Sequence, residues 1–279
     1  MTQPDTLVYA RRDGIELLVD VFRPAGKPKA AVILLHGGGW RVGSKEMMTE
    51  LAQALAGHGF IALPAQYRLL GQASWPAPIQ DVKSAIRWAR RNAATLGFEP
   101  HKIALEGFSA GAHLALLASG TNHVRDYSAA EDAEEDASVA GVIAFFPPIE
   151  FRIGAAGVPG ISEANRLLED RVSAAEAERA SPLTHAKAGF PPTCLMHGTD
   201  DHVVSHVTSQ RMADRLAADG VAVDLHLFAG HTHEFSRLPS MLPHVQSIAA
   251  SFLDRHVAEP DFHVQENFAL NPFASGRRP

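Results

Sequence analysis

Short apolar runs alternate with stretches of helical periodicity along most of this chain, and this alternation constrains the fold more than any other feature. The run AAVILLH, residues 30–36, is apolar up to its last residue, as expected of a strand covered on both faces. The stretch at residues 77–97 places Ile79, Val82 and Ile86 on one face of a helix. Further runs of both kinds follow in turn. Strands that alternate with helices predict a mainly parallel sheet with helices on both of its faces.

A β-hairpin is predicted ahead of this alternation. Asp13 and Gly14 separate two β-rich runs, and an Asp-Gly pair in that position is typical of a tight hairpin turn. Together with the later apolar runs, these two strands predict an α/β fold with a mainly parallel eight-stranded sheet and an N-terminal antiparallel hairpin.

The chain is long enough to bury one sizeable core, and no low-complexity linker divides its 279 residues. We therefore expect one domain over residues 1–258. Short charged helical segments ahead of a later strand predict a small helical cap, inserted at about residues 150–185.

The remaining residues, 259–279, form a tail without clear periodicity. It carries three phenylalanines, namely Phe262, Phe268 and Phe273. Because a tail with three large apolar side chains is poorly suited to solvent, we expect it to dock on the body or on a second copy of the chain, which would form a homodimer.

Composition excludes several classes of partner. The net charge of -6 and the pI near 6.2 argue against nucleic acid and anionic membranes, which require a basic face. Cys194 is the single cysteine, so no intrachain disulfide is expected. The first residues lack the apolar segment of a secretory signal, and no run approaches the ~18 apolar residues of a membrane span. We expect a cytoplasmic protein.

The pentapeptide GFSAG, residues 107–111, lies where a predicted strand meets a predicted helix. A G-x-S-x-G nucleophile elbow requires that context, because its serine occupies a strained turn and small neighbours let strand and helix approach closely. The alternative is a glycine-rich turn with an idle serine. The position between KIALE and AHLALLAS favours the elbow, with Ser109 as the nucleophile.

A serine hydroxyl needs a base to take its proton, and the base needs a carboxylate to orient it. In enzymes with a nucleophile elbow of this kind, the carboxylate and the base typically follow the serine in sequence, on loops after later strands. The stretch HGTDDHVV offers Asp200 and Asp201, and FAGHTHEF offers His231 and His233. Spacing alone leaves both choices open.

The stretch HGGGW, residues 36–40, follows the first predicted buried strand. Glycines there let the backbone approach a substrate without an intervening Cβ, which suits an oxyanion hole built from fixed N–H donors. The alternative is a flexible turn, which would be unusual directly after a core strand. We expect the donors to be the amides of Gly38, Gly39 and Ala110.

These motifs resemble those of the α/β-hydrolase serine esterases. The likeness is greatest to the branch with HGGGW and GxSAG, which contains acetyl-xylan and feruloyl-type esterases, kynurenine-formamidase-like enzymes and hormone-sensitive-lipase-like esterases. It covers most of the chain, from VILLHGGGWRVGSK through SPLTH and HGTDDHVV to THEF. The resemblance implies a triad of Ser109, Asp201 and His233. The family uses the second aspartate of this motif and places its base two residues ahead of a phenylalanine, here Phe235.

The resemblance also implies a function. We expect a serine carboxylic-ester hydrolase that acts on short-chain acyl esters through an acyl-enzyme, with a small-molecule ester as its partner. Amide or N-formyl hydrolysis by the same machinery is one alternative, and a non-catalytic ligand-binding protein of this fold is another. Trp40 and Phe108 flank the reacting atoms in sequence, and we expect them to wall the pocket together with Phe146.

Family members use a Tyr-Arg pair and a helix aspartate as scaffold, which implies structural roles for Tyr67, Arg68 and Asp81. Glu106 departs from the family pattern, because it stands in a predicted buried strand where an apolar residue is usual. A buried carboxylate requires a partner, and the sequence does not identify one.

We expect no metal and no cofactor. The best metal candidates are His231 with His233 and His202 with His206, but neither pair has the glutamate of an H-E-x-x-H site, and no second cysteine is present. The glycine-rich stretch at residues 36–43 lacks the G-x-G-x-x-G pattern of dinucleotide-binding folds.

Overall fold

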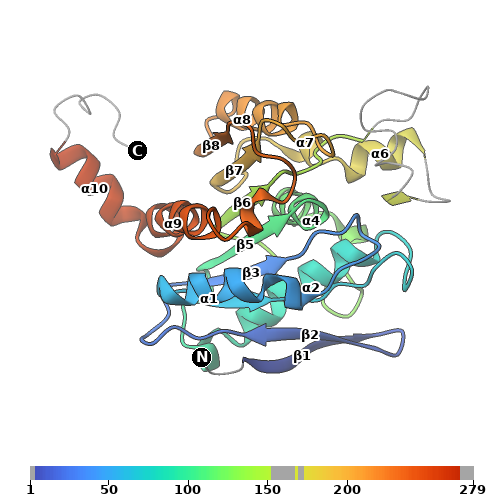
Figure 1. Ribbon diagram of the computed structural model, residues 1–279. Helices are drawn as coiled ribbons and strands as arrows, with labels where there is room; N and C mark the ends of the chain where they lie inside the picture. The colour runs from blue at the N-terminus through green and yellow to red at the C-terminus, as the bar shows by residue number, and fades with distance from the viewer. Residues whose placement is uncertain (1–3, 152–166, 169–172, 271–279) are drawn as a thin grey trace.

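The computed structural model describes residues 4–151, 167–168 and 173–270. Its centre is a parallel sheet of six strands in the order β4-β3-β5-β6-β7-β8 (Figure 1). The strands are Ala31–Leu35 (β3), Ile61–Pro64 (β4), Ile103–Phe108 (β5), Gly141–Phe145 (β6), Thr193–Gly198 (β7) and Val223–Phe228 (β8). Within the five strands β3, β4, β5, β6 and β7 every residue is buried, whereas the edge strand β8 is partly exposed. The sheet is therefore covered on both faces, as the continuous apolar runs predict.

The N-terminal hairpin consists of β1 (Asp5–Arg12) and β2 (Ile15–Val21), which pair as a separate two-stranded antiparallel sheet. Asp13 and Gly14 form its turn with φ angles of 51° and 77°, and both angles match the positive values that a tight hairpin turn requires. Isolated β-bridges connect the hairpin to the larger sheet. They join Val19 of β2 to Ala65, just after β4, and Phe22, just after β2, to Ala62 of β4. The predicted α/β fold is confirmed, with its eight strands divided into six and two.

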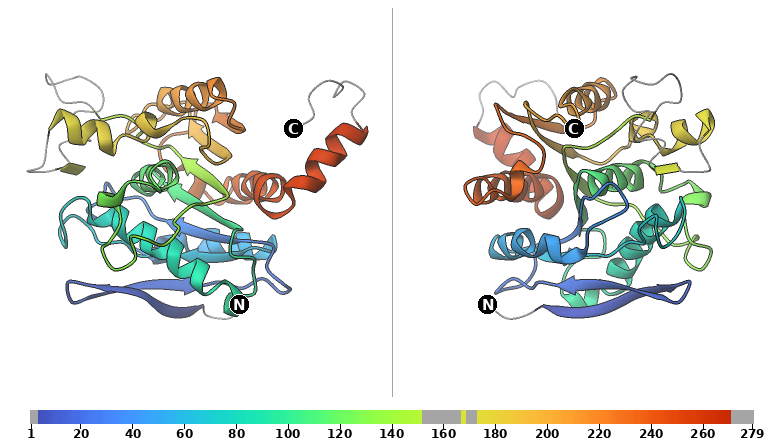
Figure 2. Two further views of the ribbon diagram at one scale, coloured as in Figure 1. Left: turned by 180° about the vertical axis from the view of Figure 1, so that it is seen from behind. Right: turned by 45° about the vertical axis from the view of Figure 1, so that its right-hand side comes forward.

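Helices form a layer on each face of the sheet (Figures 1 and 2). On one face, α1 (Thr49–Gly57) and α9 (Leu242–Leu253) pack against a core that includes Val32 and Leu34. On the other, α2 (Ala77–Arg91), α4 (Ala110–Gly120) and α8 (Val207–Ala218) pack against a core that includes Ile33 and Leu35. Alternate residues of β3 thus feed the two cores, as the period of a strand dictates.

The remaining described helices are short, apart from the last one. They are Lys45–Met48 (η1), Ala93–Leu96 (α3), Arg125–Tyr127 (η2), Ala174–Ala180 (α6), Pro182–His185 (α7), Phe235–Arg237 (η4), Asp254–Ala258 (η5) and Pro260–Leu270 (α10). No helix in the described part of the chain is long and apolar enough to cross a membrane.

Two of these helices, α6 and α7, belong to the predicted cap at about residues 150–185. Ser173 caps α6, because its hydroxyl accepts a hydrogen bond from the Glu176 amide at 3.1 Å. The amide of Leu183 in α7 donates to the Ile149 carbonyl at 3.0 Å, which ties this segment to the loop after β6. Most of residues 152–172 lies outside the described residues, so the cap as a whole stays a prediction.

The predicted tail begins as a helix. Residues 260–270 form α10, which extends away from α9 at the edge of the molecule (Figures 1 and 2). Phe262 is 54% exposed in this single chain. The side chain of Phe268 and the whole of Phe273 lie outside the described residues. Docking of the tail on the body or on a partner stays a prediction.

Candidate active site

Ser109 lies at a sharp turn between β5 and α4. Its backbone has φ 51° and ψ -115°, a conformation that is strained for any residue other than glycine. A Cβ on Gly107 would lie 2.4 Å from the Gly111 carbonyl oxygen, and one on Gly111 would lie 2.2 Å from the Leu35 carbonyl oxygen. Both glycines of the predicted elbow are therefore required: Gly107 because β5 and α4 meet closely at the turn, and Gly111 because α4 starts against the backbone at the end of β3.

A chain of hydrogen bonds connects this serine to a histidine and an aspartate. The Ser109 hydroxyl lies 3.0 Å from Nε2 of His233, and Nδ1 of the same ring lies 2.6 Å from a carboxylate oxygen of Asp201. The three side chains come from the carboxyl ends of β5, β7 and β8, which meet at one edge of the parallel sheet. The order matches a nucleophile, a base and an orienting carboxylate.

Asp201 is held on several sides. The amides of Val203 and Val204 donate to its Oδ1 at 2.8 and 2.9 Å, and His197 lies 3.3 Å from its Oδ2. Burial by itself raises the pKa of Asp201, but the hydrogen bonds from His197, His233 and Val204 outweigh burial and hold this pKa well below its ordinary value. The carboxylate therefore stays ionised opposite the His233 ring.

The glycine-rich loop approaches Ser109 from β3. Gly38 has a φ of 114°, and a Cβ there would lie 2.0 Å from the Val42 carbonyl oxygen, so only glycine fits. In the described part of the chain, the amides of Gly38 and Gly39 donate to no backbone carbonyl. The Tyr67 hydroxyl donates to the His36 carbonyl at 2.8 Å and supports the loop from below.

Arg68, the residue after Tyr67, forms a buried ion pair with Asp81. The resemblance implied structural roles for all three residues. The Arg68 guanidinium binds both carboxylate oxygens of Asp81, at 2.7 and 2.8 Å, and the Arg68 amide donates to the same carboxylate at 2.8 Å. Asp81 is fully buried and Arg68 is 5% exposed. A fully hydrogen-bonded pair of this kind fixes the chain between β4 and α2.

A pocket of about 290 Å³ opens beside Ser109. Its lining among the described residues is Gly38, Gly39, Trp40, Ser109, Ala110, Pro148, Val203, Val204, His233 and Glu234. All three residues predicted as oxyanion donors thus line the same pocket as the serine and the histidine.

Of the three aromatic residues predicted to wall this pocket, the described lining includes only Trp40. Phe108 is in β5 with its side chain in the core under α1 and α9, where it stacks on Phe145 at 4.5 Å between ring centroids. Phe146 packs behind the imidazole of His233, at 4.5 Å between ring centroids. The expectation for Phe108 is corrected because alternate residues of a strand face opposite sides. Phe146 supports the histidine instead of lining the pocket.

Spacing in the sequence left two choices open, Asp200 or Asp201 and His231 or His233, and the members of each pair lie in different places in the structure. The ring of His231 packs at a tilt against Phe235, with ring centroids 5.3 Å apart, and does not contribute to the described pocket lining. Phe235 is 1% exposed, so it anchors this loop as the family spacing implied. The Asp200 carboxylate faces solvent and lies 3.3 Å from His202.

Sequence reasoning missed four residues of the pocket lining: Pro148, Val203, Val204 and Glu234. Three of them are within three positions of Asp201 or His233, so their place next to predicted site residues was a usable signal. Pro148 carried none, because nothing local to the loop after β6 points to the site.

The parallel sheet, the helices on both faces and the order of the strands define an α/β-hydrolase fold. A family model described as BD-FAE matches residues 19–216, which include the glycine-rich loop, the elbow and Asp201. The chain belongs to this family.

Among solved structures, the chain is similar to esterase 2 of Thermogutta terrifontis in its apo form, with a TM-score of 0.80 and 29% identity over 91% of this chain and 95% of that chain. Other structures of the same esterase are described as bound to butyrate or propionate, or as phosphonylated by sarin.

Two esterases of Mycobacterium tuberculosis are also similar. Esterase LipC is 31% identical over 72% of this chain and 52% of its own length. Esterase LipU is 32% identical over 79% of this chain and 75% of its own length. The chain spans about half the length of the first curated relatives it matches.

Proposed function

We propose that this protein is a serine carboxylic-ester hydrolase that transfers the acyl group of a small ester first to Ser109 and then to water. The observation that carries the proposal is the unbroken series of contacts from Ser109 through His233 to Asp201, beside a pocket lined by Gly38 and Gly39. Similarity to an esterase over 91% of this chain supports it.

In the first step, His233 takes the hydroxyl proton through Nε2 as the Ser109 oxygen attacks the ester carbonyl. Asp201 keeps the proton of the imidazole on Nδ1 and offsets the positive charge that develops on the ring. His233 then gives its proton to the leaving alcohol, which leaves an acyl-enzyme. Water then attacks the acyl-enzyme while His233 takes its proton, and His233 returns that proton to the Ser109 oxygen as the acid is released.

The negative oxygen of each tetrahedral intermediate requires fixed donors. The amides of Gly38 and Gly39 suit this role because they line the pocket and donate to no backbone carbonyl in the described part of the chain. The Ala110 amide is at the start of α4, where helix amides have no partner within the helix. Each such donor typically raises kcat by a factor of ~10²–10³.

A short acyl chain fits the site best. The pocket volume of about 290 Å³ lies just below the roughly 300–1,000 Å³ common for ligand pockets. The esterase from Thermogutta terrifontis, which is described with butyrate and with propionate, points in the same direction. A series of p-nitrophenyl esters should give its highest kcat/KM between acetyl and butyryl. An optimum at octanoyl or longer contradicts this assignment.

Labelling with a fluorophosphonate probe separates an enzyme from a ligand-binding protein of the same fold. An activated serine is phosphonylated, and we expect the label on Ser109 and its loss in Ser109→Ala, with the melting temperature of the variant retained. A wild-type protein that hydrolyses no p-nitrophenyl acetate and takes up no probe is not a serine hydrolase. Faster turnover of N-formylkynurenine than of any ester would instead assign amide hydrolysis.

A further inference from the structure

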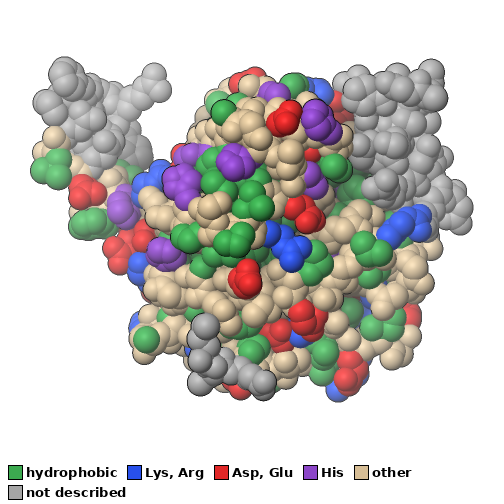
Figure 3. All heavy atoms as spheres, viewed as in Figure 1, with side chains coloured by type: hydrophobic (Ala, Val, Ile, Leu, Met, Phe, Trp, Pro, Cys, Tyr) green, Lys and Arg blue, Asp and Glu red, His purple; other side chains and the backbone are tan. Residues whose placement is uncertain are grey.

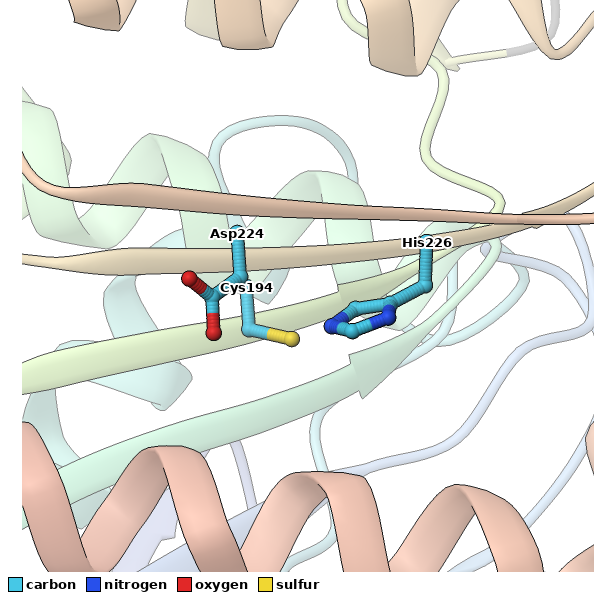
Figure 4. Close-up of side chains that lie close together, drawn as sticks. All are labelled: Cys194, Asp224 and His226. Atoms are coloured by element: carbon cyan, nitrogen blue, oxygen red, sulfur yellow. The ribbon is translucent and has the colours of Figure 1, made fainter.

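Three side chains with metal-binding atoms converge on the face of the sheet that α9 covers, away from the pocket lining. They are Cys194 of β7 and Asp224 and His226 of β8 (Figure 4). Cys194 and Asp224 are directly opposite each other in the register of the two strands, and His226 is two residues further along β8 on the same face. Among the described residues, no other group of three or more such side chains is this close together.

We propose that Cys194, Asp224 and His226 form a binding site for a thiophilic divalent metal ion of the Zn²⁺ class. Such an ion would join β7 to β8, the strands that lead to Asp201 and His233.

The separations suit an ion of this class. The three ligand atoms all lie within 4.8 Å of one another. Zinc binds sulfur at about 2.3 Å and nitrogen or oxygen at about 2.0–2.2 Å, so tetrahedral ligands are roughly 3.5 Å apart. The widest pair therefore has to close by about 1.3 Å at most when an ion binds.

His226 is the ligand best prepared for an ion. Its Nε2 is buried and has no hydrogen-bond partner among the described residues. Burial lowers the pKa of His226, so the ring is neutral near pH 7 and an imidazole nitrogen is available as a ligand. A buried polar nitrogen without a partner costs free energy, and coordination of a metal ion would remove that cost.

The thiol must lose its proton when the ion binds. Burial raises the pKa of Cys194, so the free protein holds this group as a thiol. The balanced step is Zn²⁺ plus the thiol giving a zinc–thiolate and one released proton. The thiolate and the Asp224 carboxylate then neutralise the two charges of the ion, which suits a partly buried position. The fourth ligand would be water.

Arg255 competes with the ion in the free protein, because its guanidinium is paired with the Asp224 carboxylate. The Arg255 side chain is 37% exposed, so it can turn into solvent when the ion takes its place. A surface pocket of about 240 Å³, lined by Asp224, His226, His244 and Arg255 among others, gives access from the same side. Figure 3 shows histidine side chains gathered on this face between β8 and α9.

Titration of the full-length protein with Co²⁺ tests the site, because a cobalt–thiolate bond gives a charge-transfer absorption band that oxygen and nitrogen ligands do not. We expect one Co²⁺ per chain with this band, displaced by Zn²⁺. Cys194→Ala and Cys194→Ser should abolish the band. His226→Ala should weaken binding by at least ~10-fold, since loss of even an outer-shell partner has that effect.

Two further variants sharpen the result. Arg255→Met removes the competitor of the ion and should tighten Co²⁺ binding, whereas loss of a merely structural arginine would not. His101→Ala, a matched control at a side chain that is 73% exposed, should leave binding unchanged. Wild-type protein without the thiolate band, or equal Co²⁺ affinity in wild type, Cys194→Ala and His226→Ala, overturns the proposal. Hydrolysis of p-nitrophenyl acetate by each variant shows separately whether the proposed esterase is intact.

Discussion

Glu106 shows how a single residue in the central strand depends on one partner from far along the chain. Its carboxyl group is fully buried in β5 and accepts a hydrogen bond from the side-chain amide of Gln246 at 2.9 Å. The second oxygen of Glu106 and the side-chain oxygen of Gln246 are both buried without a partner in the described structure. A proton on Glu106 would turn its second oxygen into a donor, which is the kind of partner that the Gln246 oxygen lacks.

The pKa of Glu106 supports this protonated form. Burial raises it to about 7, against the lowering effect of the hydrogen bond from Gln246. The folded protein thus holds the proton more tightly than the unfolded chain, whose glutamates titrate near 4.3. The stability that the protonated pair contributes is complete below that value and is lost as the pH rises to about 7.

Glu106→Gln mimics the protonated acid at every pH, since its amide donates to Gln246 as the acid does. We expect a melting temperature above that of wild type by roughly 2–8 °C at pH 8, equivalent to about 1–2 kcal/mol, and little difference at pH 4.5. Thermal unfolding at both pH values provides the measurement. The exposed Glu178→Gln serves as control, and an equal shift at both pH values would show that ionisation of Glu106 is not involved.

We expect alanine substitutions at the two histidines after β8, His231 and His233, to lower kcat by amounts that differ by orders of magnitude. His233→Ala should lower kcat by about four to six orders of magnitude, the usual effect of losing a triad base. His231→Ala should lower kcat at most about tenfold, because its ring packs against Phe235 and contributes only to the position of the loop. Both variants are assayed on one short ester. A large loss in His231→Ala with little loss in His233→Ala would reverse the assignment.

At the scale of elements, His113 connects three segments that build the site. It is fully buried in α4, one turn after Ser109. The indole N–H of Trp40 donates to its Nδ1 at 3.1 Å, so its Nε2 carries the proton and donates to the Ala180 carbonyl of α6 at 2.8 Å. Burial lowers the pKa of His113 to about 4, which keeps the ring neutral and both contacts intact. The nucleophile helix, the glycine-rich loop and the first described cap helix are joined through this one ring.

His113→Leu removes both hydrogen bonds, whereas His113→Gln offers an acceptor and a donor in their place. We expect the leucine variant to lose roughly 10- to 100-fold in kcat with a smaller change in KM, because Trp40 directly follows Gly39 and the loop shifts. Glutamine should restore most of kcat. Steady-state kinetics on a short ester give both values, and a leucine variant that melts earlier but keeps wild-type kcat would show a purely structural role.

At the scale of the whole molecule, the surface that remains unexplained is on the last described helix. Phe262, Val264 and Leu270 of α10 are 54%, 42% and 76% exposed. Single exposed apolar side chains are common, but three on one short helix are typical of a surface that packs against something else. A homodimer and a cytoplasmic location, which we expected from the sequence, stay predictions.

Truncation after Ala258 tests whether the tail docks. If it packs on the body or on a second copy, removing it should lower the melting temperature or increase the elution volume in size-exclusion chromatography. The full-length chain at the same concentration is the control. A truncated protein with unchanged melting temperature, elution volume and ester hydrolysis would show that the tail contributes to none of these.

Local patterns in the sequence were sufficient for most of the elements and for the elbow. Runs of apolar residues and helical periodicity depend on neighbours along the chain, so they identified the strands, the hairpin and the long helices around the sheet, but not α10 in the tail. The requirement for Gly107 is local as well, because a Cβ there would meet the Gly111 carbonyl four residues later, whereas a Cβ on Gly111 would meet the backbone of Leu35 in β3. The family spacing ahead of Phe235 already favoured His233 over its neighbour.

Tertiary structure decided the contacts between distant residues that no sequence motif predicted. Gln246 as the partner of Glu106, His113 as a link between helices, and Phe108 in the core instead of the pocket all depend on which elements pack together. Cys194 and His226 belong to different strands, and only the register of β7 with β8 brings them to one face. Periodicity identifies which side of a strand or helix a residue occupies, but only the packed arrangement of elements determines what that side meets.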